Sequence, residues 1–330
     1  MSEVFARRYE LLDPIADGGM GSVWLVRDQE DGQVKVAKLL RHSDAGSLLR
    51  FMREQSTRIH HPHVVTPISW AGEDDTVLFT MPLVRGGSVA TLVGDWGRLP
   101  EQWVRTVLEQ TLSALEAVHA ARVVHRDVKP ANLLLEPTGA GRPHVRLTDF
   151  GIAVPVDQPR MTLSSTTLGT PGYMPPEQLA GDDPDPRQDL YAAAMVGLEM
   201  LVGHPPPFRD DEVPTTPLGR VLMRAGDPDP SRRPASASAM LGELQGLHQP
   251  AEPWDPGEVE VLDHFEGRFT GPAYPAHPAP TTVLQVADRP APATSATPPA
   301  RSPRHGSSLP IVLALLGALL LALSAFLLLR

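Results

Sequence analysis

Two short segments of this chain carry residues suited to phosphate chemistry. The first is HRDVKPAN at residues 125–132, and the second is DFG at residues 149–151. Carboxylate and amide oxygens are ligands that Mg²⁺ prefers, and a lysine ammonium can neutralise phosphate charge. Phosphoryl transfer asks little covalent chemistry of a protein, but it needs positioned charge around a metal-bound triphosphate. The two segments therefore predict a phosphoryl-transfer site.

These segments resemble the catalytic loop and metal-binding motif of eukaryotic-type (Hanks-type) Ser/Thr protein kinases, and the likeness covers residues 9–248. The resemblance implies that Asp127 accepts the proton of the substrate hydroxyl and that Lys129 neutralises charge on the transferring group. It implies that Asn132 and Asp149 hold two Mg²⁺ ions on the phosphates of ATP, with Mn²⁺ as an alternative metal. A lysine two positions after the aspartate resembles Ser/Thr kinases, whereas tyrosine kinases carry another pattern. The alternative, a solvated turn, fits two intact and correctly ordered segments poorly.

A glycine-rich stretch, IADGGMGSV at residues 15–23, resembles the phosphate loop of the same family. Glycines let backbone N–H groups approach phosphate oxygens without interference from a Cβ atom. Ala16 stands at the first glycine position, and alone the stretch could be a structural hairpin. Lys38 strengthens the functional interpretation because it follows at the separation expected for the lysine that binds the α- and β-phosphates. The ATP-contacting residues implied here are Ile15, Gly18, Gly21, Val23 and Lys38.

The resemblance places two more parts of the nucleotide pocket. Glu54 is the candidate to pair with Lys38 and orient it, although the interval from Glu54 to the following HPHVV motif is shorter than is usual in the family. The alternative is that Glu54 is a solvated helix residue. The segment MPLV aligns with the hinge between lobes, where the backbone of Pro82 and Val84 meets adenine and Met81 closes the pocket. Proline suits its position because the family's contact there uses the carbonyl group.

The segment GTPGYMPPE at residues 169–177 resembles the loop that receives the substrate peptide, with Pro175 where alanine is usual. The resemblance implies a structural ion pair between Glu177 and Arg233. It also implies that Asp189 begins a helix and braces the backbone of the catalytic loop. These three residues are expected to be architectural.

Five hydroxyl residues lie between the DFG and GTPGY motifs, and they are candidate phosphorylation sites: Thr162, Ser164, Ser165, Thr166 and Thr167. Arg126 directly precedes Asp127, which in the family marks kinases whose activation segment is ordered when its phosphate meets arginine. The alternative is a flexible Ser/Thr-rich loop.

The elements that must position these residues are visible in the apolar spacing. Residues 9–84 alternate short apolar runs with turns, with one helix-like stretch over 47–59, as in a small mainly β lobe. Helical spacing begins at Glu101, with one apolar face made by Trp103, Val107, Leu108, Leu112, Leu115 and Val118. Further helices are predicted over 189–202 and 235–247, and Pro234, just before the second pattern, suits the first position of that helix. We therefore expect an α+β, bilobal protein-kinase fold with a mainly helical large lobe. The stretch between Phe208 and Leu218 is too short for the extra helix that the family usually has there.

Composition limits the partners of the chain. Its 330 residues carry a formal charge of −10, which argues against a nucleic-acid partner, and they include no cysteine, which excludes disulfides and thiolate metal sites. Beyond a short tail at 1–8 and the kinase-like domain at 9–248, residues 249–308 form a Pro/Ala-rich linker that we expect to be extended or disordered, with one strand-like island at 259–265.

Residues 309–329 are an uncharged apolar run of about the 20 residues needed to cross a bilayer. We expect a transmembrane helix there rather than a buried core helix, because the run follows a long polar linker. No basic segment followed by an apolar core occurs at the N-terminus, so we expect no secretory signal and a cytoplasmic kinase domain on a single-pass membrane protein.

The sequence as a whole predicts a Ser/Thr protein kinase of the bacterial membrane-tethered type, which uses ATP and Mg²⁺ to phosphorylate protein substrates. It is expected to autophosphorylate in signal transduction, with self-association and membrane lipid as further contacts. The alternative from another class is a pseudokinase that acts as a nucleotide-binding scaffold. Ala16 and the shortened segments favour that alternative, while Lys38, Asp127, Asn132 and Asp149 oppose it. A small-molecule kinase is disfavoured by the resemblance to a peptide-binding loop.

Overall fold

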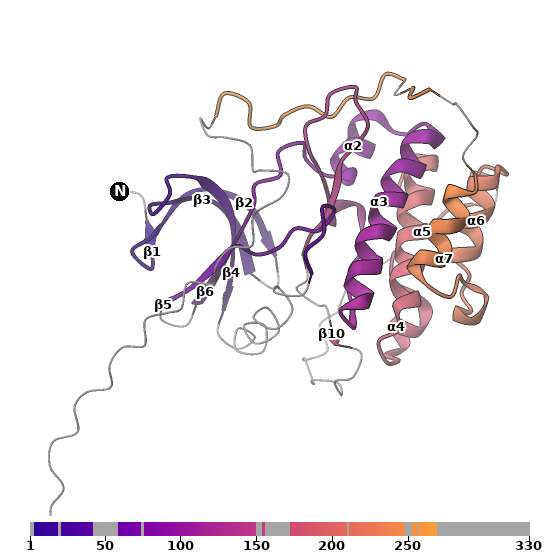
Figure 1. The fold of residues 1–330 in the computed structure, drawn as a ribbon, viewed down its shortest axis with the longest axis horizontal. Helices are drawn as coiled ribbons and strands as arrows, with labels where there is room; N and C mark the ends of the chain where they lie inside the picture. Colours follow the sequence, from indigo (N-terminus) through magenta and orange to yellow (C-terminus); the bar gives the residue numbers. More distant parts are fainter. Residues whose placement is uncertain are drawn as a thin grey trace, which may run out of the picture. The chain divides into compact units, whose positions relative to one another are not determined.

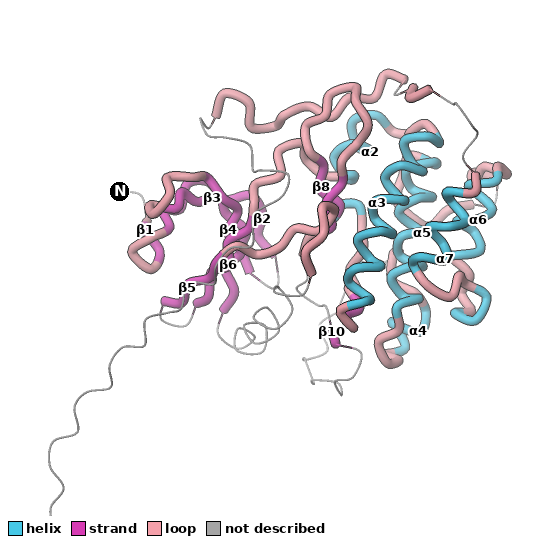
Figure 2. Tube along the Cα trace, viewed as in Figure 1, coloured by secondary structure: helices cyan, strands magenta, loops and turns pink. Residues whose placement is uncertain are grey.

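The computed structural model describes residues 3–18, 21–41, 59–73, 76–149, 154–155, 172–209, 211–247, 253–255 and 257–268. The chain divides into two units, residues 1–281 and 282–330, and all described residues belong to the first. Figures 1 and 2 show the elements of this unit, with strands gathered in one part and helices in another.

The small lobe is an antiparallel sheet of six strands in the order β1-β2-β3-β4-β6-β5 (Figure 1). The strands are β1 (Val4–Phe5), β2 (Tyr9–Gly18), β3 (Gly21–Asp28), β4 (Val34–Arg41), β5 (Ser69–Glu73) and β6 (Thr76–Met81). Alternate residues of these strands point to one face, where Tyr9, Val26, Ala37 and Leu78 are fully buried. The predicted β lobe is confirmed, while most of the helix-like stretch at 47–59 lies outside the described residues.

The large lobe is mainly helical. Its helices are α2 (Val89–Trp96), α3 (Glu101–Ala120), α4 (Pro176–Ala180), α5 (Pro186–Val202), α6 (Pro217–Ala225) and α7 (Ala237–Gln245). Helix α3 packs against α5 and α7 and buries the whole apolar face that its sequence predicts. Each residue named for that face, from Trp103 to Val118, is inaccessible to solvent. The bilobal α+β fold is therefore confirmed.

Two helix starts differ from the sequence prediction. Helix α5 begins at Pro186, earlier than residue 189, because the Asp185 side chain accepts the backbone N–H of Arg187 and caps the helix. Helix α7 begins at Ala237, so the prediction of Pro234 as its first residue is wrong. Ser236 is the cap, since its hydroxyl accepts the N–H of Ala239. Between α5 and α6, the described residues form turns and no helix.

Short strands and two turns of 3-10 helix lie between the longer elements. Strand β7 (Val123–Val124) pairs with β10 (Val154–Pro155), and β8 (Leu133–Leu135) pairs with β9 (Val145–Leu147). The 3-10 turns are η1 (Pro130–Asn132) and η2 (Pro230–Arg232). The catalytic loop therefore runs from the end of β7 into η1, and β9 leads directly to Asp149.

A part of the expected linker is ordered. Residues 253–255 and 257–268 pack on the large lobe, with Val259 and Val261 only 4% and 1% exposed. The expectation of an extended linker from residue 249 is therefore wrong for this segment, because its few apolar residues find a place in the core of the large lobe. The strand-like island forms a single β-bridge, from Val261 to Gly139.

Within the described part of the chain, none of the helices is both long and apolar enough to cross a bilayer. The predicted transmembrane run at 309–329 lies outside the described residues.

Candidate active site

The catalytic loop brings Asp127, Lys129 and Asn132 into direct contact. The Lys129 ammonium lies 2.8 Å from Oδ2 of Asp127. The Asn132 amide nitrogen donates to the Asp127 carbonyl at 2.7 Å and to its Oδ2 at 3.0 Å. Because both contacts use Nδ2, the amide oxygen of Asn132 is the atom left to face a metal. One carboxylate, one ammonium and one amide oxygen therefore share a single small volume.

A buried carboxylate from helix α5 braces this loop. Asp189 is inaccessible to solvent and accepts the backbone N–H groups of His125 at 2.9 Å and Arg126 at 2.8 Å. Arg126 has a positive φ of 66°, a conformation that costs energy for a side chain with a Cβ. Burial alone would raise the pKa of Asp189, but the hydrogen bond from His119 and the backbone N–H donors hold that pKa below its usual value. The carboxylate therefore fixes a strained loop.

His125 joins the catalytic loop to the segment that carries Asp149. Its Nδ1 accepts the backbone N–H of Asp127 at 3.3 Å, so its Nε2 carries the proton and donates to the carbonyl of Thr148 at 3.0 Å. The backbone N–H of Thr148 in turn donates to the carbonyl of Asn132 at 2.9 Å. These bonds set the spacing between Asp127 and Asp149.

Asp149 forms an ion pair with Lys38 across the two lobes. The register of the sheet places Lys38 of β4 between Val23 of β3 and Phe79 of β6. Burial acts to raise the pKa of the Asp149 carboxyl, but the Lys38 ammonium outweighs it and holds the pKa below its usual value. Asp149 is therefore a carboxylate at neutral pH, as a metal ligand must be.

The glycine-rich stretch lies in the paired strands β2 and β3. Gly18 pairs with Gly21 at the end of β2 and β3. Gly21 has a φ of 135°, and a Cβ there would lie 2.0 Å from the carbonyl oxygen of Leu39, so only glycine fits. Ala16 pairs with Val23 directly after a register shift between Pro14 and Ala16, at the position where the family has its first glycine. Ile15 is 47% exposed, although it is a large apolar residue.

The hinge follows β6. Met81 is the last residue of that strand, and Pro82 and Val84 after it are buried. The hydroxyl of Thr148 lies 3.9 Å from the sulfur of Met81, which connects the hinge to the residue before Asp149. The structure therefore brings the predicted hinge, lysine, base and metal ligands to one place between the lobes.

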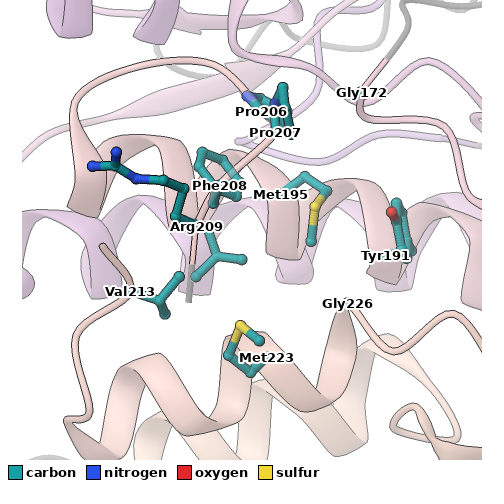
Figure 3. A pocket seen from close by; sticks show the side chains of 11 residues that line it. Gly172, Tyr191, Met195, Pro206, Pro207, Phe208, Arg209, Val213, Met223 and Gly226 are labelled. Carbon is teal, nitrogen blue, oxygen red and sulfur yellow. The ribbon is translucent and has the colours of Figure 1, made fainter. Parts of the chain in front are cut away.

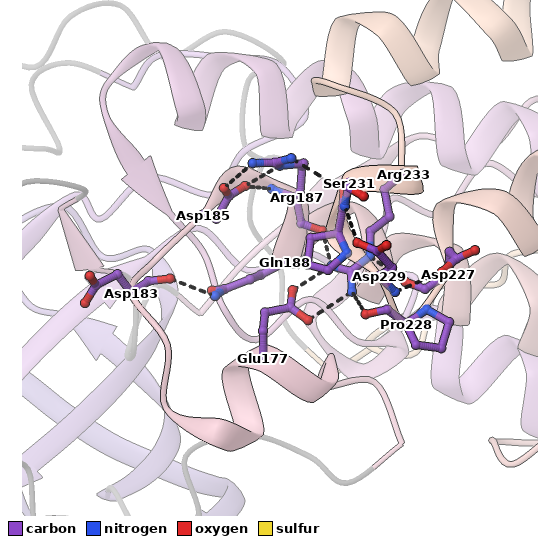
Figure 4. A network of polar contacts seen from close by, with 11 residues as sticks. Glu177, Asp183, Asp185, Arg187, Gln188, Asp227, Pro228, Asp229, Ser231 and Arg233 are labelled. Carbon is purple, nitrogen blue, oxygen red and sulfur yellow. Dashed lines mark hydrogen bonds and ion pairs between the residues drawn. The ribbon is translucent and has the colours of Figure 1, made fainter.

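The structure contains the ion pair that the sequence predicts in the large lobe (Figure 4). Arg233, whose side chain is fully buried, contacts both carboxylate oxygens of Glu177 at 2.6 and 2.9 Å. Arg233 also donates to the carbonyls of Asp227, Pro228 and Arg187. The guanidinium thereby ties the end of the peptide-binding loop to α5 and η2.

Two contacts made by residues 172–178 were not predicted. The Tyr173 hydroxyl donates to the buried Glu199 of α5, and burial together with this carboxylate raises the pKa of Tyr173. The Gln178 amide donates to the carbonyl of Arg126 at 3.0 Å, which links α4 to the catalytic loop. Both join residues far apart in sequence, so spacing gives no signal for them.

A cavity of about 500 Å³ opens beside the peptide-binding loop (Figure 3). It lies where α5 and α6 face each other without a further helix between them. Its apolar lining includes Met195, Phe208, Val213 and Met223, with Gly172 at one edge. The shortened segment after Phe208 therefore leaves a hollow, not a helix.

Several predicted residues lie outside the described part of the chain. These are Glu54, the Phe150 and Gly151 of the DFG motif, and the hydroxyl residues Thr162, Ser164, Ser165, Thr166 and Thr167. Among the residues that the structure does describe, no three His, Asp or Glu side chains form a ready-made metal cluster.

Comparison with known proteins gives a consistent result. A family model described as the protein kinase domain matches residues 9–224. Curated relatives include Serine/threonine-protein kinase pkn3 of Myxococcus xanthus, 33% identical over 279 residues, covering 75% of this chain and 51% of the relative. Serine/threonine-protein kinase PknA of Mycobacterium tuberculosis is 39% identical over 209 residues, covering 60% of this chain and 48% of PknA. Serine/threonine-protein kinase PkaA of Streptomyces coelicolor is 32% identical over 268 residues, covering 71% of this chain and 49% of PkaA. The chain thus spans about half the length of these relatives.

Proposed function

Because this chain belongs to the protein kinase family, we propose that it is a Ser/Thr protein kinase, which transfers the γ-phosphate of ATP to serine and threonine hydroxyls of proteins. The observation that carries the proposal is the convergence of Lys38, Asp127 and Asp149 between a β lobe and a helical lobe. The relatives are named Ser/Thr kinases, and Lys129 beside Asp127 fits that specificity.

The residues support a direct in-line transfer. The substrate hydroxyl oxygen bonds to the γ-phosphorus, the bond from that phosphorus to the β,γ-bridging oxygen breaks, and ADP leaves with the electron pair. Asp127 accepts the hydroxyl proton. Lys129, 2.8 Å from Asp127, offsets the negative charge of the transferring phosphoryl group. Lys38 holds the α- and β-phosphates, so the leaving group is fixed before the reaction.

The donor set fits Mg²⁺. Asp149 supplies a carboxylate with a depressed pKa, and Asn132 supplies an amide oxygen because its nitrogen is engaged by Asp127. Mg²⁺ usually takes one or two protein oxygens and completes its shell with water and phosphate, so a larger protein cluster is not required. When bound, the metal neutralises charge on the triphosphate.

The pseudokinase alternative receives no support from the comparisons, whose named relatives are kinases. Its sequence arguments also weaken. Ala16 keeps its pairing with Val23 in the β2–β3 hairpin, and the shortened segment after Phe208 leaves α5 and α6 in place.

Phosphate transfer to the protein itself is the test. Full-length protein in detergent is incubated with Mg²⁺ and ATP labelled at the γ-phosphate, and the labelled residues are identified after acid hydrolysis. We expect label on phosphoserine or phosphothreonine, and none when the label is on the α-phosphate. Absence of transfer to the chain and to a general acceptor such as myelin basic protein would overturn the proposal.

We further propose that the chain is regulated by autophosphorylation in Thr162, Ser164, Ser165, Thr166 or Thr167. A phosphate there adds charge that Arg126 can bind, which would order the activation segment. Peptide mass spectrometry should find phosphate between residues 155 and 170, and replacing all five hydroxyl residues by alanine or valine should lower activity. Phosphate found only elsewhere, or unchanged activity, contradicts this proposal.

The membrane location is likewise a proposal. The apolar run 309–329 supports a single span, and Arg301, Arg304 and His305 before it favour a cytoplasmic kinase domain. Membrane tethering would raise the local concentration of neighbouring copies and so favour phosphorylation between them. Deleting residues 309–330 should move the protein to the soluble fraction. Full-length protein that is soluble without detergent, or a kinase domain cut by external protease on intact cells, contradicts this topology.

A further inference from the structure

Residues 253–255 and 257–268, called the strap below, run over the large lobe and reach the hinge. Figure 1 draws them in orange, passing the region of α2. They lie beyond residue 224, where the match to the protein kinase family ends. The strap therefore lies outside the part of the chain that the family model matches.

Its first part is anchored on helix α3. The Gln102 amide donates to the carbonyl of Pro253 at 2.8 Å and accepts the N–H of Asp255 at 2.7 Å. Trp254 is the residue between these two. Its ring lies 5.7 Å from the Trp103 ring, and its Nε1 donates to the carbonyl of Ala140 at 3.0 Å. Because the Gln102 side chain bonds two backbone groups of the strap, it fixes the position of the strap on α3.

Its middle part is built into the core. The N–H and carbonyl of Val261 exchange two hydrogen bonds of 3.0 Å with Gly139. The Val261 side chain packs on Gly86, where a Cβ would lie 2.6 Å from it. Val261 is 1% exposed, so the contact excludes water. Gly86 comes two residues after Val84, which places the strap directly against the chain that leaves the hinge.

Its last part holds the residue after the hinge by three bonds. The N–H of His264 donates to the carbonyl of Arg85 at 2.9 Å. The Arg85 guanidinium pairs with the Asp263 carboxylate at 3.0 Å and donates to the carbonyl of Phe265 at 3.4 Å. Both partners of the ion pair are 21% exposed, so solvent screens the pair only in part. Backbone and side chain of Arg85 are therefore both fixed by the strap.

We propose that the strap positions the hinge for ATP. This inference rests on the proposed kinase function, because the hinge groups at Pro82 and Val84 are those expected to meet adenine. A hinge held on its outer side presents these groups in one conformation, so nucleotide binding costs less ordering entropy. Releasing Arg85 raises the KM for ATP and leaves kcat nearly unchanged, since the strap's contacts with Gln102, Gly139 and Arg85 involve none of Lys38, Asp127 or Asp149.

The test uses charge reversal in the full-length chain. Asp263→Arg places two guanidinium groups together and should weaken binding of a fluorescent ADP analogue and raise the KM for ATP about fivefold. Adding Arg85→Asp to Asp263→Arg restores an ion pair with the two charges exchanged, and should recover most of the affinity for the ADP analogue. Glu260→Arg is the matched control, because it makes the same charge change at an exposed position of the strap.

The outcomes separate the strap from the proposed function. Wild-type protein that binds the ADP analogue but transfers no phosphate contradicts the kinase proposal and leaves the strap testable by binding alone. Hydrogen exchange of the amides at 84–88 should quicken in Asp263→Arg and slow again in the double variant. Unchanged analogue affinity in Asp263→Arg, or equal loss in Glu260→Arg, overturns the strap proposal.

Discussion

Strand β4 carries two lysines that face two different regions of the molecule. Lys35 is 6% exposed and lies 2.6 Å from both Asp28 and Asp31 of its own lobe. Lys38 pairs with Asp149, which belongs to the other lobe. Because side chains alternate along a strand, residues three apart point to opposite faces. The same residue type on one strand therefore serves two surfaces of the sheet.

The carboxylate partners explain the difference. Asp28 is inaccessible to solvent and contacts the Arg8 guanidinium as well as Lys35, so its charge is balanced within the small lobe. Asp149 keeps 35% of its side chain exposed and has φ at 66°, a backbone conformation that is uncommon for a residue with a Cβ. A saturated, buried pair stabilises a lobe, whereas an accessible pair between lobes is available for a ligand.

Replacing each lysine by methionine gives the strongest test of this difference between Lys35 and Lys38. Lys38→Met should reduce phosphate transfer on the order of a thousandfold, because the phosphates lose their cation. Its unfolding midpoint should stay near that of the wild type. Lys35→Met is the matched control and should unfold more easily, since Asp28 keeps a buried charge, while the folded fraction still transfers phosphate. The measurements are steady-state transfer and thermal unfolding of both variants, and reversed results would refute the assignment.

The large lobe offers a purely structural carboxylate for the same comparison. Asp189→Ala removes the acceptor of two buried backbone N–H groups, at His125 and Arg126. We expect the free energy of unfolding to fall by about 3 kcal/mol, since each orphaned donor costs about 1–3 kcal/mol. Chemical denaturation measures the loss. Asp182→Ala, at an exposed position, is the control, and an equal small loss in both variants would show that Asp189 does not brace the loop.

The small-lobe cluster predicts a response to acid. Burial acts to raise the pKa of Asp28, but its bonds to Arg8 and Lys35 lower it to about 2. An aspartate in the unfolded chain has a pKa of about 4. The stabilisation of the folded state by Asp28 is therefore complete above about pH 4 and is lost as the pH falls toward 2. Asp28→Asn should be less stable at neutral pH and should lose less stability over this range. Asp95→Asn, exposed on α2, should keep the wild-type slope, and an unchanged slope in Asp28→Asn contradicts the prediction.

Local patterns predict much of the site. The segments HRDVKPAN and DFG place Asp127 and Asn132 on one loop and Asp149 beside it, because short stretches of chain fix their own geometry. The apolar face of α3 follows from helical spacing in the same way. Two other contacts join residues that are distant in the sequence, namely Tyr173 with Glu199 and Gln178 with the catalytic loop. Residue spacing therefore does not predict them.

The strap shows why composition can mislead. Its proline-rich surroundings predict an extended or disordered chain, and only the island at 259–265 shows strand-like alternation. Trp254, Val259 and Val261 nevertheless find places already formed on the large lobe. Their order depends on the folded surface that receives them, and the sequence of the segment alone does not contain that surface.

The central claim is that Asp127 receives the substrate proton in a phosphate-transferring site. The most direct measurement compares autophosphorylation of full-length wild type with Asp127→Asn, a change that keeps an acceptor oxygen for Lys129 and Asn132 but removes the base. The account predicts transfer by wild type, a reduction on the order of a thousandfold in the variant, and closely similar thermal unfolding of the two proteins. Equal label in both purified proteins would contradict it.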